Sequence, residues 1–143
     1  MLAHILAAIL TTAATQPLTV TLDRAGDPVD VTYDARPDVR FRQLGHVSPP
    51  GRPSSLRCAW SADLRVARRA ERRGVPLASL SRDLARLNLA EGSRHGWCAQ
   101  VRAGVEQEVA GMAAAAQPRI REVVTRDQAS VSAELRSLAP PPA

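Results

Sequence analysis

The chain contains two cysteines, Cys58 and Cys98, which lie far apart in its sequence. In an exported chain, an even number of cysteines indicates a disulfide. Such a bridge would close a loop of about 40 residues, which stabilises the folded state by about 4 kcal/mol through chain entropy. We therefore expect a covalent link between the middle of the chain and its last third.

Two other states of the cysteines are alternatives to the disulfide. They could be reduced, buried thiols, or they could bind zinc together with His46 and His95. Zinc sites usually carry a close pair of ligands on each side, and here only His95 and Cys98 are close. No C-x-x-C motif is present to indicate redox chemistry. We therefore expect neither a metal nor a cofactor.

The supply of large apolar side chains is small. Hydrophobic residues make up 45% of the 143 residues, but many are alanine, and aromatic residues reach only 3%. Such a chain predicts one domain with a thin core, to which a disulfide would matter. Trp60 and Trp97 each lie within two residues of a cysteine. We expect both tryptophans and the disulfide to form one cluster that joins a sheet to a helix.

The first residues predict export. An apolar run over residues 2–10, interrupted only by His4, precedes small residues and is typical of a signal peptide over residues 1–15, cleaved near Ala14. The run is too short to span a bilayer. No basic residue precedes Arg24, which departs from the usual pattern, and an apolar N-terminal helix is the alternative. We expect a periplasmic or secreted protein, whose layout resembles small exported bacterial proteins, including the UrcA type.

The first half of the mature chain predicts β-strands. Apolar and polar side chains alternate over residues 18–22 and 29–33, with turn residues between them, and again over residues 39–44. The proline-rich residues 48–55 predict a loop. Residues 57–73 fit two patterns. Alternation favours a strand over about residues 56–67, and the alternative is a helix that starts near Ser61.

The second half predicts helices. Leu77, Leu80, Leu84 and Leu87 share one face of a helix that ends at Gly92, and residues 92–96 form a loop. The next helix buries Trp97, Val101, Val105, Val109 and Met112, and Gln117–Pro118 kinks or restarts it before an apolar stripe over residues 120–138. The predicted fold is α+β: three to four antiparallel N-terminal strands packed against C-terminal helices over residues 16–138, with one disulfide, followed by a disordered tail over residues 139–143.

All 19 basic residues are arginines, and the net charge is +5. Residues 52–73 hold seven arginines and two acids, so this segment carries the whole excess of positive charge. Five of these arginines could bind an anion such as a phosphate: Arg65, Arg68, Arg69, Arg72 and Arg73. They would form one stripe in the helical alternative, and they would crowd the end of the strand and the following turn in the favoured one. The alternative is a solvated surface. A nucleic-acid ligand is disfavoured, because the charge is modest and no aromatic side chains are interleaved with the arginines.

The sequence contains none of the common catalytic motifs. His95 could act as a general base with Glu91, but no nucleophile accompanies them. Three hypotheses remain open. The first is a non-enzymatic module that binds an anionic envelope component or another exported protein. The second is a small hydrolase with a site near His95, and the third is an inhibitor or accessory subunit of an exported enzyme.

Overall fold

The computed structural model of the chain describes residues 16–24 and 26–138. The predicted signal peptide and the predicted tail lie outside the described residues. The elements follow in the order β1 (Leu18–Arg24), β2 (Asp27–Leu44), β3 (Arg57–Arg72), β4 (Val75–Pro76), the 3-10 turn η1 (Ala78–Leu80), β5 (Arg82–His95), α1 (Cys98–Ala115) and α2 (Gln117–Ser137).

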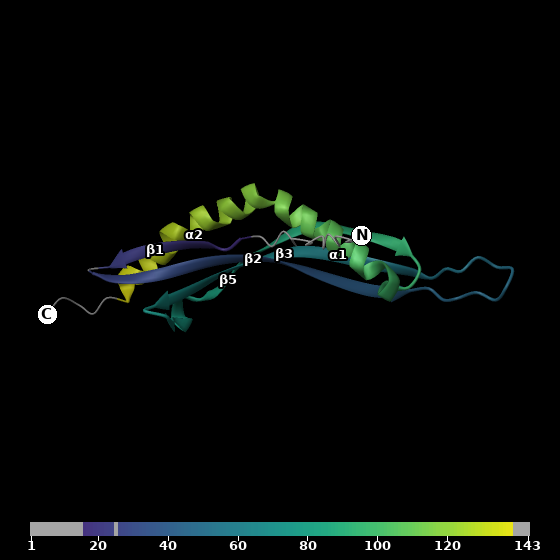
Figure 1. The fold of residues 1–143 in the computed structure, drawn as a ribbon, viewed down its shortest axis with the longest axis horizontal. Helices are drawn as coiled ribbons and strands as arrows, with labels where there is room; N and C mark the ends of the chain where they lie inside the picture. Colours follow the sequence, from purple (N-terminus) through teal and green to yellow (C-terminus); the bar gives the residue numbers. More distant parts are fainter. Residues whose placement is uncertain (1–15, 25, 139–143) are drawn as a thin grey trace, which may run out of the picture.

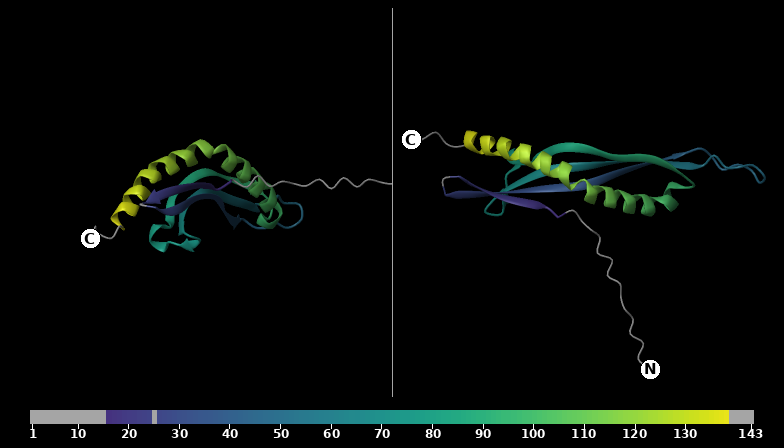
Figure 2. Two further views of the ribbon diagram at one scale, coloured as in Figure 1. Left: turned by 60° about the vertical axis from the view of Figure 1, so that its left-hand side comes forward. Right: turned by 90° about the horizontal axis from the view of Figure 1, so that it is seen from above.

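The strands form one antiparallel sheet. β1, β2 and β3 are neighbours in that order, and both β4 and β5 pair with the other side of β3. The hairpin of β2 and β3 runs along the length of the molecule, and both helices lie over the same face of the sheet (Figure 1). Together the helices form an arch above it (Figure 2). The predicted α+β class, with an antiparallel sheet, two C-terminal helices and a Cys58–Cys98 disulfide, is confirmed.

Residues 57–73, which fitted both a strand and a helix, form the strand β3 up to Arg72. β3 buries every second residue against the helices, starting from Cys58 and Trp60 and ending at Ala70. The alternating apolar positions therefore identified the element correctly, and the strand continues to Arg72, beyond the predicted end. The helical alternative for this segment was wrong.

β2 is one strand where the sequence predicted two. Pro37 interrupts the alternation and pairs with Leu64 in the middle of the strand. A proline lacks the backbone N–H that a central strand needs, but it is tolerated at an edge. The pairing of β1 with β2 ends at Tyr33, so among the described strands only β3 pairs with β2 at Pro37.

The predicted helix that began at Leu77 is absent from the described chain, where η1 and β5 stand instead. Register shifts in the pairing of β5 with β3 insert Leu84 and Leu89 as extra residues. A bulge places two successive side chains on one side of a strand, so Leu84, Leu87 and Leu89 all pack toward the helices. The bulge therefore explains why Leu84 and Leu87, three residues apart, share one side of β5, whereas the four-residue step from Leu80 to Leu84 leads from η1 into β5. The predicted loop at residues 92–96 was also wrong, because β5 continues to His95.

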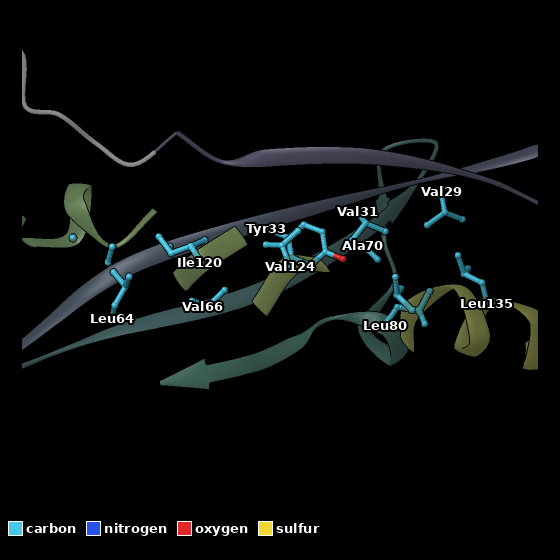
Figure 3. Close-up of a cluster of buried hydrophobic side chains, with 14 residues drawn as sticks. Val29, Val31, Tyr33, Leu64, Val66, Ala70, Leu80, Ile120, Val124 and Leu135 are labelled. Carbon is cyan, nitrogen blue, oxygen red and sulfur yellow. The ribbon is translucent and has the colours of Figure 1, made fainter. Parts of the chain in front are cut away.

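Two apolar clusters hold the helices on the sheet. The larger cluster joins Val31, Tyr33 and Val66 to α2, from which Ile120 and Val124 point toward the sheet (Figure 3). The smaller one joins Trp60 to Val105 and Val109 of α1. Ala116 separates the helices, and Pro118 stands in the first turn of α2, so the predicted restart there is confirmed.

The buried face of α1 differs from the prediction at its two ends. Val105 and Val109 are buried as expected, but Ala113 is buried instead of Met112, which is exposed. Trp97, predicted to lie on this face, precedes the first turn of α1 and is 49% exposed.

Candidate functional site

The arginines that the sequence grouped together are separated by the alternation of β3. Arg65 and Arg69 are exposed on the side of the sheet opposite the helices, whereas Arg68 points inward and is fully buried. Arg72 lies at the end of the strand and Arg73 in the following turn. The helical stripe of five arginines does not form.

Arg68 is enclosed by acids from α2. Its Nη1 donates to both carboxylate oxygens of Asp127, at 2.7 and 2.9 Å, and its Nη2 donates to Glu134 at 3.0 Å. Its Nε donates to the carbonyl oxygen of Leu80 at 2.7 Å. An arginine with its donors satisfied in this way is a structural cation that fixes α2 on the sheet, and it is closed to an external ligand.

Tyr33 completes the buried network. Its hydroxyl donates to Asp127 at 2.9 Å. Burial, followed by this hydrogen bond and the negative charge of Asp127, raises the pKa of Tyr33 well above its ordinary value, because each disfavours the phenolate. The tyrosine therefore remains a neutral donor across the physiological range of pH.

Arg72 and Arg73 both form ion pairs with Asp27, at the end of the sheet where β2 begins. Arg72 Nε lies 3.0 Å from Asp27, and Arg73 Nη2 lies 3.8 Å from the same carboxylate. All five arginines of the predicted site thus have acidic partners from other segments of the chain, since Arg65 pairs with Asp83 and Arg69 with Asp34. The local positive charge of residues 52–73 is largely balanced in space.

We call the outward side chains of β2, β3 and β5, on the side away from the helices, the open face. One row of it consists of arginines in direct register, Arg36 on β2, Arg65 on β3 and Arg86 on β5. Like charges directly opposite each other repel. Carboxylates on both sides relieve the repulsion, with Asp34 2.7 Å from Arg36 and Asp83 2.9 Å from Arg65.

Asp63 is the central acid of the open face. It is nearly buried, lies 2.7 Å from Arg40 and 3.3 Å from Arg86, and faces Asp38 across the β2–β3 ladder. Arginine and aspartate rows therefore alternate along the sheet, about 7 Å apart, because successive outward residues of a strand are two positions apart. The open face carries balanced, regularly spaced charge.

At the end of the open face near the disulfide, acidic side chains no longer balance the positive charge of the arginines. Within residues 16–24 and 26–138, Arg42 and Arg57 have no carboxylate within 4.0 Å. A shallow hollow of about 690 Å³ lies beside Arg42. Its lining comprises the outward residues Arg40, Arg42, Ala59, Ser61, Glu91 and Ser93 and the intervening residues Phe41, Trp60 and Gly92. We call it the distal hollow. A second hollow, of about 520 Å³, lies among the arginine and aspartate rows from Asp34 to Asp83.

The disulfide closes this end of the molecule. Cys58 of β3 is fully buried, and its bridge to Cys98 ties the first turn of α1 to the sheet. The side-chain oxygen of Gln43 accepts the backbone N–H of Cys98 at 2.7 Å. Trp60 packs against α1 beside the bridge, but the half-exposed Trp97 lies outside the buried clusters, so the expected cluster of both tryptophans was only partly right.

The structure does not bring His95 and Glu91 together. Both point outward from β5, four residues apart on the same strand, which places their backbones about 13 Å from each other. Among the described residues, no group of three or more histidine, cysteine, aspartate or glutamate side chains could hold a metal ion. The disulfide occupies both sulfur atoms of the zinc site that was considered.

Sequence reasoning missed the acids that balance the arginines. Asp34, Asp83 and Asp127 stand in three different elements, and pairing with β3 or packing of α2 brings them to Arg69, Arg65 and Arg68. In the folded sheet, the register of β2 with β3 places Asp34 opposite Ala67, two residues from Arg69 on the same strand. No signal in the sequence indicated which residues of α2 would face Arg68.

A scan against protein-family models, a search of the curated proteins and a search of the solved structures each found no match for the chain. In the part of the chain that the structure describes, neither helix is long and apolar enough to span a membrane.

Proposed function

We propose that this chain is an exported, non-enzymatic interaction module that binds an anionic component of the cell envelope through the arginines of the open face. The observation that carries the proposal is the row of Arg36, Arg65 and Arg86, in register on three neighbouring strands of a face that no described helix covers. Planar guanidinium groups suit carboxylate and phosphate ligands because they donate two parallel hydrogen bonds.

The ion pairs of the open face are compatible with ligand binding. Arg36, Arg65 and Arg69 are each about half or more exposed. Arg65 and Asp83 form an exposed pair, which contributes about 0–1 kcal/mol, so an incoming anion displaces Asp83 at little cost. Arg68 is excluded from the site by its burial, and Arg65 and Arg69 remain as members of the predicted set.

Export is supported by the disulfide, because such bridges persist in oxidising compartments. The apolar residues at the start of the chain support the same proposal. A non-enzymatic role is supported by the separation of His95 from Glu91 and by the shallowness of the open face.

The test measures binding of the oxidised protein to vesicles with anionic lipid and to an acidic polysaccharide, at about 20 mM and about 300 mM salt. We expect binding at low salt that weakens at high salt. Replacing Arg36, Arg65 and Arg69 by glutamine should weaken it at least tenfold. The matched control replaces three exposed arginines of α2, Arg121, Arg126 and Arg136, and changes the net charge equally. No binding of either probe at low salt, or equal losses in the two triple variants, would overturn the proposal.

A second candidate, an inhibitor or accessory subunit, is favoured by one observation. The loop between β2 and β3 is held by its own serines: Ser48 donates to the carbonyl of Pro53, and Ser54 donates to that of His46. Such a loop needs little ordering on binding. Replacing Pro49, Pro50 and Pro53 by glycine should weaken inhibition of a secreted protease, measured on a panel with peptide substrates. Absence of inhibition by the wild type across the panel would end this candidate.

A further inference from the structure

The distal hollow differs in polarity from the rest of the open face. Its floor is made of small side chains, Ala59 and Ser61 of β3 with Ser93 of β5, which leave space above the sheet. Its two walls carry opposite charges, because β2 contributes Arg42 and β5 contributes Glu91.

The spacing of the two walls follows from the sheet. β3 lies between β2 and β5, so the charged walls stand on strands about 10 Å apart. Arg42 and Glu91 are both exposed, and within the described chain neither forms an ion pair. The exposed Arg40, on the same wall as Arg42, is held by Asp63 at 2.7 Å. The guanidinium of Arg42 and the carboxylate of Glu91 are therefore both available to a ligand.

This arrangement selects among anionic ligands. Arg42 suits a carboxylate or a phosphate, whereas Glu91 repels a second anion and accepts hydrogen bonds from hydroxyl or ammonium groups. The hydroxyls of Ser61 and Ser93 can both donate and accept. A duplex nucleic acid presents dense negative charge along its whole length and would meet repulsion at Glu91. A sugar chain with carboxylates separated by hydroxyl groups matches both walls and the floor.

We propose that the distal hollow is a subsite for an acidic glycan, in which the sugar carboxylate binds Arg42 and neighbouring sugar hydroxyls bind Glu91, Ser61 and Ser93. The inference rests on the proposed function and names the ligand class for one end of the same face. The arginine rows nearer α2 would then bind further acidic sugars along the chain of the glycan.

The experiment titrates the oxidised protein with trigalacturonate, with its neutral methyl ester and with duplex DNA, by calorimetry at low salt. Arg42→Gln should weaken trigalacturonate binding about tenfold, the value of one charge-assisted hydrogen bond. Glu91→Gln removes a repulsive charge and weakens the hydrogen bond from the sugar hydroxyls, so it should strengthen DNA binding more than trigalacturonate binding, whereas a purely structural role would change both equally. Arg121→Gln on α2 is the matched control and should change neither.

Three outcomes separate this inference from the proposed function. The methyl ester binding as well as the acid, or Arg42→Gln and Glu91→Gln both behaving like Arg121→Gln while acidic polysaccharide still binds, would overturn the subsite alone. Glu91→Gln weakening DNA and glycan equally would overturn the assigned role of Glu91. Failure of the wild type to bind vesicles, polysaccharide and trigalacturonate would overturn both proposals.

Discussion

Arg68 of β3 and Asp127 of α2 meet in the interior, with Nη1 of the arginine 2.7 and 2.9 Å from the two carboxylate oxygens. The pair joins the longest hairpin to the last helix across 59 residues of sequence. Because Tyr33 donates to the same carboxylate, three elements converge on one acid. A buried ion pair costs desolvation, but the additional hydrogen bonds to Arg68 and Asp127 offset part of that cost.

Removing one partner of this pair should be strongly destabilising. Arg68→Met leaves Asp127 without its counter-charge in the interior and should lower the free energy of unfolding by about 3–5 kcal/mol. Urea denaturation of the oxidised protein measures the loss. Arg65→Met is the control, because its exposed pair with Asp83 should contribute less than about 1 kcal/mol. The double variant Arg68→Met, Asp127→Leu should recover part of the loss, and equal losses in the two single variants would contradict a structural role for Arg68.

Tyr33 is the only tyrosine, so its ionisation can be followed directly in the ultraviolet absorbance. The folded protein should show no phenolate near pH 10, whereas the protein in urea should titrate there, because burial and Asp127 raise the pKa of Tyr33 in the folded state. A raised folded pKa stabilises the fold below pH 10, and this stabilisation is lost as the pH rises above that value. A normal tyrosine titration in the folded protein would contradict the buried hydrogen bond.

Replacing Tyr33 by phenylalanine separates the hydroxyl from the ring. Tyr33→Phe removes one hydrogen bond to a buried carboxylate that keeps its contacts with Arg68, and it should cost about 1–3 kcal/mol at neutral pH. The variant should also lose stability less steeply than the wild type above pH 10, because it has no phenol to ionise. The measurement is the urea midpoint at pH 7 and at pH 10.5.

Gly92 of β5 should be intolerant of a side chain. A Cβ atom at this position would lie 3.0 Å from the ring of Trp60, which is packed under α1. Gly92→Ala should therefore destabilise the protein by about 1–3 kcal/mol and change the fluorescence of Trp60. The comparison is Gly111→Ala in α1, where nothing lies within 4 Å and alanine should stabilise the helix by about 0.5–1 kcal/mol. Equal effects of the two changes would contradict the packing described.

The disulfide should contribute more to stability than any single exposed contact. Replacing Cys58 and Cys98 by alanine removes the constraint on the unfolded chain and should cost about 4 kcal/mol. The measurement compares urea denaturation of the oxidised wild type with that of the double variant. An intact mass without reduction, two hydrogens below that of the reduced chain, checks the bridge itself. A variant as stable as the wild type would contradict the contribution assigned to it.

The sequence by itself determined those elements whose patterns are local. The alternation of apolar residues around Cys58 and Trp60 identified β3. The four-residue spacing of Val105 and Val109, which places them on one face of a helix, identified α1. The even cysteine count identified the bridge. These signals are reliable because a strand or helix buries one face, and the spacing of apolar residues then records which element it is.

Only the tertiary structure determined that residues 82–95 form a strand and which arginines are buried or exposed. Two bulges let a strand present Leu84 and Leu87 on one face, so their spacing imitated a helix until β3 supplied the pairing partner. Arg65, Arg68 and Arg69, neighbours in sequence, acquire separate environments because strand alternation sends Arg68 inward to Asp127 and the other two outward. Charge acts through space, and the acids that balance these arginines lie in other elements. Only the folded chain therefore shows which arginines of the open face lack an acidic partner among the described residues, namely Arg42 and Arg57 near the disulfide.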